Sequence, residues 1–137
     1  MKEALLSIIK DENRIITGQI DPQYLSDNLG RKKGTAEAVV FPISTEEVSG
    51  VMRYAWKNNL PVTPRGAGTN LVGSTVPSGH GIVLDVSLMN HVLELDEETF
   101  TATVEPGVVL EDFQAYVESK GLFYPPDPGE KKATIGG

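Results

Sequence analysis

The residues best suited to chemistry lie in one glycine-rich stretch, residues 64–74, which reads PRGAGTNLVGS. Gly66 and Gly68 can adopt positive φ angles and allow a ligand to approach the bare backbone. Successive N–H groups of such small residues can converge on one concavity that binds an anion. Thr69 adds a hydroxyl donor and Arg65 a positive charge. The stretch therefore has the groups needed to hold a pyrophosphate; the alternative is a plain surface loop whose glycines only permit turns.

The two familiar nucleotide-binding loops have a different pattern. The dinucleotide fingerprint GxGxxG opens directly into a helix. Gly66 and Gly68 match its first two glycines, but Leu71 stands at the third position. The glycines and the proline of residues 73–81 are incompatible with a helix, and no Gly-Lys-Ser/Thr sequence follows as a P-loop requires. A phosphate bound here would meet the backbone of an extended loop.

Short strands and a helix are expected to position this loop. Apolar runs predict buried strands at 38–41, 60–64 and 82–86. Ser44 and Glu47 form a capping-box pattern that begins a helix between the first two strands. Strand, helix and strand make a βαβ unit with parallel strands, and the glycine loop follows its second strand. The buried face of the helix is expected to carry Val48, Val51, Met52, Ala55 and Trp56.

Further segments complete the expected architecture. Residues 92–96 and 101–105 alternate apolar and polar side chains around an acidic turn, which predicts a hairpin with one solvated face. An amphipathic helix is expected over 110–120. Residues 1–35 are interpreted as a helical lead-in, with a second short helix over 21–28. The predicted fold class is α+β or α/β: a small parallel βαβ sheet plus a hairpin, covered by helices.

Composition excludes several classes of function. The 137 residues are enough for one domain, and a net charge of −7 argues against binding to nucleic acid. There is no cysteine, and His80 and His91 are the only histidines, which makes a metal site improbable on composition. The first residues are too polar for a signal peptide, and no run is long enough to span a membrane, so a cytoplasmic protein is expected.

Several motifs, taken in order, resemble the FAD-binding domain shared by vanillyl-alcohol oxidase and p-cresol methylhydroxylase. Within that family the chain is most similar to the flavin subunit of glycolate oxidase and to FAD-dependent D-lactate dehydrogenases. The resemblance divides the chain into a helical lead-in, 1–35, and the N-terminal part of a truncated PCMH-type FAD-binding domain, 36–137. The motifs that carry it lie at 64–70, 82–90, 104–108, 125–129 and 133–137.

The resemblance implies a set of cofactor-binding residues. The loop that would wrap the FAD pyrophosphate consists of Arg65, Gly66, Ala67, Gly68, Thr69, Asn70, Leu71, Gly73 and Ser74. The second motif would line the flavin and its ribityl chain with Pro126, Asp127, Thr134, Gly136 and Gly137. Some members of the family attach the flavin covalently to a histidine of the first loop. Thr69 stands at that position, so non-covalent FAD is expected.

The resemblance also implies an activity for a longer protein: oxidation of a 2-hydroxy acid of the glycolate or D-lactate type to a 2-oxo acid. In such relatives the substrate cap and the catalytic histidines come later in the chain. This chain is therefore expected to be an inactive fragment with no catalytic residue of its own. Apolar surface left exposed by the missing half predicts self-association. The alternatives are a stand-alone nucleotide- or phosphate-binding module without catalysis, and a structural piece whose loop binds nothing.

Overall fold

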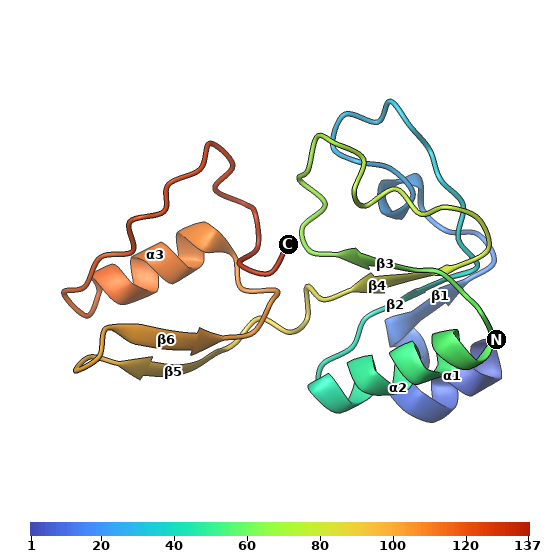
Figure 1. Cartoon of the computed structure of the whole chain (residues 1–137), viewed down its shortest axis with the longest axis horizontal. Helices are drawn as coiled ribbons and strands as arrows, with labels where there is room; N and C mark the ends of the chain where they lie inside the picture. The colour runs from blue at the N-terminus through green and yellow to red at the C-terminus, as the bar shows by residue number, and fades with distance from the viewer.

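A computed structural model describes residues 1–137 and shows two lobes (Figure 1). The larger lobe contains a four-stranded sheet, and the smaller lobe contains a hairpin and one helix. The C-terminus lies between the lobes, beside the end of the strand that leads into the glycine loop (Figure 1). This placement brings the last residues of the chain next to the loop at residues 66–68.

The larger lobe is built from two helices, four strands and two single turns of 3-10 helix. In chain order these are α1 (Lys2–Ile9), η1 (Glu12–Arg14), β1 (Ile15–Thr17), η2 (Pro22–Tyr24), β2 (Ala38–Val40), α2 (Thr45–Lys57), β3 (Val62–Arg65) and β4 (Ile82–Asp85). The smaller lobe contains β5 (Val92–Asp96), β6 (Thr101–Val104) and α3 (Leu110–Glu118).

The sheet of the larger lobe has the strand order β1-β2-β4-β3. β2 and β3 run parallel, as the βαβ pattern predicts, but they are not neighbours, because β4 lies between them and pairs in parallel with both. Ile82 is accordingly opposite Ala38 on one side and Val62 on the other. All four residues of β4 are buried, as expected for a central parallel strand covered on both faces.

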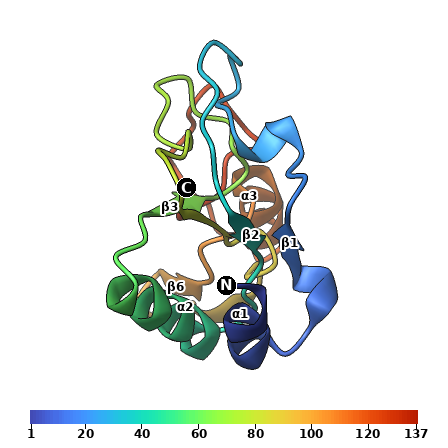
Figure 2. The same ribbon diagram turned by 90° about the vertical axis from the view of Figure 1, so that its right-hand side faces the viewer.

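Helices α1 and α2 cover one face of this sheet (Figure 2). Leu5 and Ile9 of α1 and Val51 and Ala55 of α2 are buried in the main core. Val39 and Val83 point to the opposite face and pack with Ile20 of the N-terminal segment. The core thus holds β4 in place from both sides, and β4 in turn fixes the two strands beside it.

The capping pattern at the start of α2 is confirmed, except that the Glu47 carboxylate bonds to the N–H of Ile43 and not to that of Ser44. The Ser44 hydroxyl accepts a hydrogen bond from the Glu47 N–H at 3.2 Å. The Glu47 carboxylate reaches back to the N–H of Ile43 at 2.9 Å and pairs with Arg14. The expectation that Met52 and Trp56 lie on the buried face was wrong, because these residues are 46% and 85% exposed. The buried stripe of α2 is centred on Val51 and Ala55, and the next residue after Ala55 is turned about 100° away from it.

The lead-in is less helical than predicted. Residues 15–17 form β1, which extends the sheet antiparallel to β2. The predicted helix over 21–28 is only the single turn η2, although Asp21 does accept a hydrogen bond from the Gln23 N–H as an N-cap should. The side chains of Ser26 and Asp27 bond to nearby backbone groups, which stabilises turns in place of a continued helix. The domain boundary at residue 36 stays a prediction.

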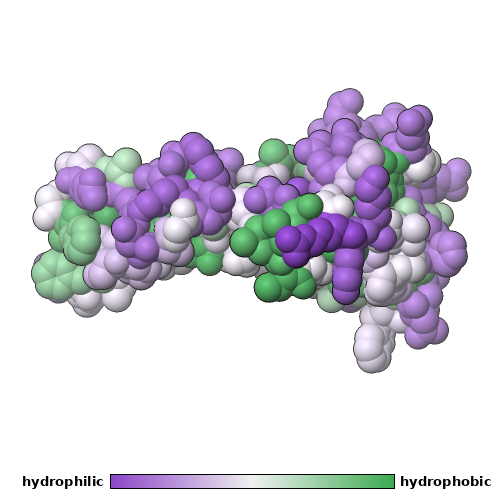
Figure 3. Space-filling model, turned by 90° about the horizontal axis from the view of Figure 1, so that it is seen from above, coloured by the Kyte–Doolittle hydropathy of each residue, from purple (hydrophilic) through white to green (hydrophobic).

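The smaller lobe contains the predicted hairpin and the predicted amphipathic helix. β5 and β6 form the antiparallel hairpin, and α3 packs across one of its faces. Val108, Phe113 and Val117 make a separate small core there. The space-filling view shows the two lobes joined by a narrower middle (Figure 3). None of the helices has both the length and the apolar character needed to cross a membrane.

Candidate functional site

The glycine loop forms one wall of a cavity of about 540 Å³ at the junction of the two lobes. It leaves the sheet at the end of β3, and the C-terminal segment, residues 130–137, forms the opposite wall. The cavity is lined by Pro64, Arg65, Gly66, Ala67, Gly68, Thr69, Asn70, Leu71, Ser74, Thr75, Val86, Pro106, Glu130, Thr134, Gly136 and Gly137. Two segments that are far apart in the sequence therefore share one site.

The loop carries a continuous row of free hydrogen-bond donors. None of the backbone N–H groups of residues 66–73 donates to another group of the chain. Backbone donors in a folded protein are normally satisfied by the chain, by water or by a ligand. Gly66 is buried, so water has little access to its N–H. Residues 66–71 of this run line the cavity, and a row of unpaired N–H groups there is suited to an anion with several oxygen acceptors.

The glycines are required by close packing. A Cβ on Gly66 would lie 2.1 Å from the Thr134 hydroxyl oxygen, and one on Gly137 would lie 2.4 Å from the same atom. A Cβ on Gly68 would lie 2.2 Å from Nη2 of Arg65, and this glycine also has a φ of +71°. The loop and the C-terminal segment thus approach each other closely around the Thr134 side chain, and only glycine leaves room for this contact at Gly66 and Gly137.

Asn70 stabilises the turn of the loop from inside. Its side-chain oxygen accepts a hydrogen bond from the Ser74 N–H at 3.1 Å, and its Nδ2 donates to the Thr75 hydroxyl at 2.7 Å. Its backbone carbonyl accepts from the Asn28 N–H at 3.1 Å. The side-chain amide of Asn70 therefore already has hydrogen-bond partners within the chain. Its contribution to the site is the shape of the loop.

Arg65 is held by a buried acid and an aromatic ring. Its Nε lies 3.4 Å from Oδ2 of Asp85, and the two side chains are 10% and 4% exposed. Its guanidinium carbon lies 5.4 Å from the centre of the Tyr24 ring. Burial, and to a smaller extent the Asp85 carboxylate, raise the pKa of the Tyr24 phenol above its usual value, so the ring stays neutral. Arg65 Nη1 is buried and has no hydrogen-bond partner.

The structure brings most of the sequence-predicted site residues together. Gly73, Pro126 and Asp127 are the exceptions, because they do not line the cavity. Gly73 has a positive φ of 79° and serves the turn. The Pro126 carbonyl accepts a hydrogen bond from Gln114, and the Asp127 carboxylate pairs with Lys131. The cofactor contacts expected of these three residues stay predictions.

Gly136 and Gly137 line the cavity but offer no free donor. The Gly136 N–H donates to the Pro106 carbonyl at 2.9 Å, and the Gly137 N–H donates to the Thr134 carbonyl at 3.2 Å. Their contribution is a compact backbone wall. The Thr134 hydroxyl, which lies between the two walls, is buried and has no partner in the chain.

Five lining residues were missed by sequence reasoning: Pro64, Thr75, Val86, Pro106 and Glu130. Pro64 and Thr75 flank the predicted loop and could have been included with it. Val86 and Pro106 are brought in by the paths of two other segments, which no local pattern reveals. Glu130 is an exposed acid in a turn-rich tail, where charges are common and carry no signal.

The two histidines lie outside the cavity lining. His80 is exposed, and its ring reaches Glu37 at 3.4 Å. His91 pairs with Glu105, with 2.7 Å between Nδ1 and Oε2. The backbone N–H of His91, followed by its ring, lowers the pKa of the Glu105 carboxyl. These contacts hold the start of β5 against the segment that follows β6.

A family model described as an FAD binding domain matches residues 36–137. The chain belongs to this family. The chain is 43% identical to the glycolate oxidase subunit GlcD of Bacillus subtilis and 41% identical to a D-lactate dehydrogenase of Anaerostipes hadrus. These alignments cover 100% and 90% of the chain but only 29% and 26% of the two relatives.

A solved structure agrees with the assignment of the fold. The FAD-binding domain superimposes on p-cresol methylhydroxylase with a TM-score of 0.73 and 22% identity, over 88% of this chain and 24% of that one. The expected resemblance to the p-cresol methylhydroxylase family is therefore confirmed at the level of the fold.

The residues present fit the diphosphate of FAD. The free N–H groups of residues 66–71 supply donors along the cavity, and Gly66 and Gly68 leave room for Thr134 and Arg65 to pack beside the loop. The unpartnered Thr134 hydroxyl adds a buried polar group at the same place. Glu130 is the one acidic side chain in the lining and opposes an anion.

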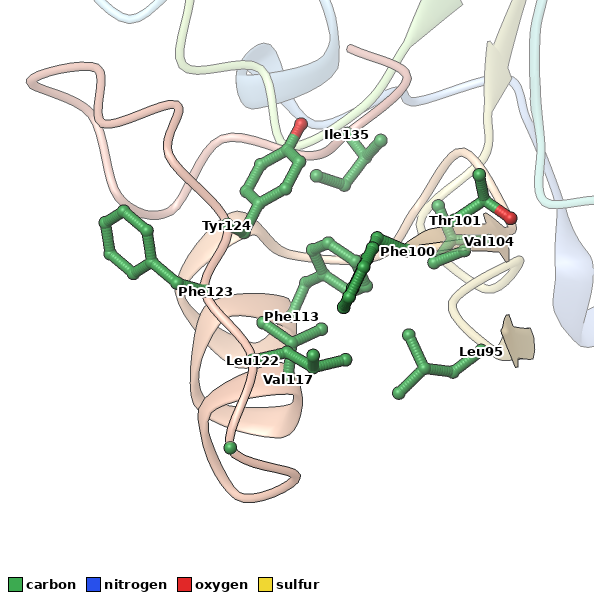
Figure 4. A pocket seen from close by; sticks show the side chains of 12 residues that line it. Leu95, Phe100, Thr101, Val104, Phe113, Val117, Leu122, Phe123, Tyr124 and Ile135 are labelled. Atoms are coloured by element: carbon green, nitrogen blue, oxygen red, sulfur yellow. The ribbon is translucent and has the colours of Figure 1, made fainter. Parts of the chain in front are cut away.

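A second cavity of about 450 Å³ lies in the smaller lobe between the hairpin and α3 (Figure 4). Its labelled side chains are mostly aromatic and aliphatic and converge from β5, β6, α3 and the segment after α3 (Figure 4). No charged residue lines it, so it lacks the groups that bind a diphosphate. The FAD-binding domain therefore has one cavity suited to phosphate and one suited to apolar groups.

Proposed function

We propose that this chain supplies the diphosphate-binding half of the cofactor site in an FAD-dependent enzyme that oxidises a 2-hydroxy acid to a 2-oxo acid. The observation that carries the proposal is the row of unpaired backbone donors at residues 66–71, which line the cavity opposite the C-terminal segment. When bound, FAD supplies the hydride-accepting chemistry, and the protein supplies position and electrostatics.

Different residues have different parts in this proposal. The N–H groups of residues 66–71 donate to the diphosphate, with Thr69 and Ser74 as added hydroxyl donors. Asn70 keeps the loop turned, and Thr134 and Gly136 form the wall that limits access of water. We expect the FAD to be held non-covalently, because Thr69 stands where some members of the family have the histidine that attaches the flavin.

The substrate class rests on the relatives. The glycolate oxidase subunit and the D-lactate dehydrogenase are both named for 2-hydroxy acids, and this chain spans less than a third of either. Within the chain no acid–base pair lines the phosphate cavity, since Glu130 is the only carboxylate there and no histidine is present. Substrate binding and hydride removal are therefore assigned to the remaining part of such an enzyme.

The test is a titration of the purified chain with FAD, followed by flavin fluorescence after desalting. Gly68→Val is the decisive variant, because a Cβ there collides with Arg65 and the residue needs a positive φ. Gly129→Ala is the matched control, because a Cβ at that glycine meets nothing within 4 Å. We expect the wild type and the control to retain FAD and Gly68→Val to lose it.

Two other outcomes would contradict the proposal. Equal FAD retention by Gly68→Val would show that the loop is not the binding element. Absence of FAD binding by the wild type would show that this half of the site does not hold the cofactor. Covalent attachment would appear as flavin that remains with the polypeptide after denaturation, and we expect none.

Two further expectations remain predictions that accompany this function. One is a cytoplasmic location. The other is self-association through exposed apolar surface, for which the apolar cavity of the smaller lobe offers a site.

A further inference from the structure

Arg65 is more deeply placed than a phosphate-binding arginine needs to be. Its side chain is packed between Asp85 at the end of β4 and the Tyr24 ring of η2. The pairing with Asp85 compensates its charge locally, so little net attraction remains for an anion in the cavity. Tyr24 adds a cation–π contact over the face of its ring, which helps to hold the guanidinium in place.

The guanidinium lies directly against the backbone of Gly68. An added Cβ there would lie 2.2 Å from Nη2, 2.3 Å from Cζ and 2.4 Å from Nη1. Nη1 is covered to the point that it contacts neither solvent nor an acceptor. Nη1 is therefore not exposed to the cavity, although other atoms of Arg65 line it. The guanidinium contacts the loop at Gly68.

The N-terminal segment adds further support to the same loop. The Asn28 N–H donates to the Asn70 carbonyl at 3.1 Å, and the Thr75 hydroxyl lies 3.5 Å from the Ser26 carbonyl. Tyr24 also meets Phe41 edge-on, with ring centres 5.7 Å apart. The ring that stacks on Arg65 is thus itself fixed by the end of β2.

We propose that Arg65 is a positioning residue, clamped by Tyr24 and Asp85, which holds Gly68 in the conformation that presents the loop's N–H groups. This inference rests on the proposed function in that the loop binds the FAD diphosphate. It also assigns a part of the cofactor site to Tyr24, which lies outside the matched residues 36–137. In this arrangement the planar shape of the Arg65 guanidinium matters more for FAD binding than its charge does.

The first test compares Tyr24→Leu with Tyr24→Phe in FAD titrations of the whole chain. Phenylalanine keeps the ring face over the guanidinium, and leucine removes it. We expect Tyr24→Phe to bind FAD as the wild type does and Tyr24→Leu to bind about tenfold more weakly, as for loss of a desolvated cation–π contact. Arg65→Lys should also bind weakly although it keeps the charge, because lysine lacks the planar group.

The second test is independent of FAD. Two-dimensional NMR of the free chain reports the amides of Gly66 and Gly68 and the Nε–H of Arg65. We expect Tyr24→Leu to shift and broaden these signals and to leave unchanged the amide of Val51 in α2, which belongs to the core on the other face of the sheet. Circular dichroism at the titration temperature checks that each variant is folded.

The outcomes separate the inference from the proposed function. If Tyr24→Leu leaves the glycine amides unchanged, or if Arg65→Lys binds FAD as the wild type does, the positioning role is overturned. If the wild type binds no FAD but the glycine amides respond to Tyr24→Leu, the proposed function fails and the positioning role stands. Normal FAD binding and normal loop signals in Tyr24→Phe complete the supporting result.

Discussion

At the scale of single residues, Glu130 is the one side chain of the cavity lining whose negative charge would repel a diphosphate. Its carboxylate accepts a hydrogen bond from the Lys132 N–H at 2.8 Å, which keeps it at the edge of the cavity. A negative charge beside a diphosphate repels it, and the repulsion is weakened by solvent and by salt.

Replacement of Glu130 by glutamine should therefore strengthen FAD binding. We expect a gain of about two- to fivefold at low ionic strength, in line with an exposed charge pair, and a smaller gain at high salt. Isothermal titration at two salt concentrations measures both. Asp127→Asn is the matched control, because Asp127 lies close in sequence but outside the cavity. An equal effect of the control would favour the sequence-based placement of Asp127 at the cofactor.

At the scale of the elements, Arg14 connects four parts of the larger lobe. It donates to both oxygens of Glu47 at 2.6 and 2.9 Å, and also to the backbone carbonyls of Ile9 and Phe41. The ends of α1 and β2 and the start of α2 are thereby joined at one side chain. The hydrogen bonds from Arg14 are the main reason that the pKa of the Glu47 carboxyl is held below its usual value.

The consequence is an acid-sensitive contribution to stability. A carboxyl whose pKa is lower in the folded state stabilises the fold above its unfolded value, near 4.5, and the contribution is lost as pH falls through the folded value. Glu47→Gln should lower the free energy of unfolding by about 2 kcal/mol at pH 7. The difference from wild type should vanish in strong acid.

Urea unfolding at pH 7 and at low pH measures this difference. Glu46→Gln is the control, because Glu46 lies in the same first turn of α2 but is exposed. A Glu47→Gln variant as stable as the wild type at pH 7 would contradict the prediction.

The elements with a strong local signal are those that the sequence predicts well. The cap at Ser44, the apolar run of β4 and the alternation around the hairpin each reflect local chemistry, and each is present. β1 has only three residues and no readable period, and it exists because β2 offers it an edge. Trp56 was misplaced because a stripe of apolar residues does not reveal how wide the buried face is.

The same distinction applies to the site. The glycine loop is predictable because its own glycines and small residues indicate the backbone conformation that it needs. The clamp on Arg65 is not, since Tyr24, Arg65 and Asp85 come from three separate elements that only the tertiary fold brings together. The opposite wall at 133–137 was predicted only through family resemblance, because its contact with Gly66 has no local signal.

At the scale of the whole molecule, the smaller lobe leaves aromatic surface uncovered. Phe100 and Phe123 are 77% and 74% exposed, and both line the apolar cavity. Figure 3 shows apolar atoms at the far end of this lobe. Clustered exposed aromatic side chains favour association between copies.

The double variant Phe100→Asn, Phe123→Ser should therefore shift the chain toward monomer. Phe100 has a φ of +55°, which asparagine tolerates, so the hairpin should remain intact. Analytical ultracentrifugation over a range of concentrations measures the change. Trp56→Ser is the control on the larger lobe. Loss of association in that variant alone would place the contact on α2.

The position of the phosphate cavity between two separate cores has a mechanical consequence. Each lobe has its own apolar interior, and one wall of the cavity belongs to each. A molecule that bridges both walls opposes any rotation of one lobe against the other. A bound cofactor would thus restrict motion between the two lobes, and the chain would be most rigid with the cofactor bound.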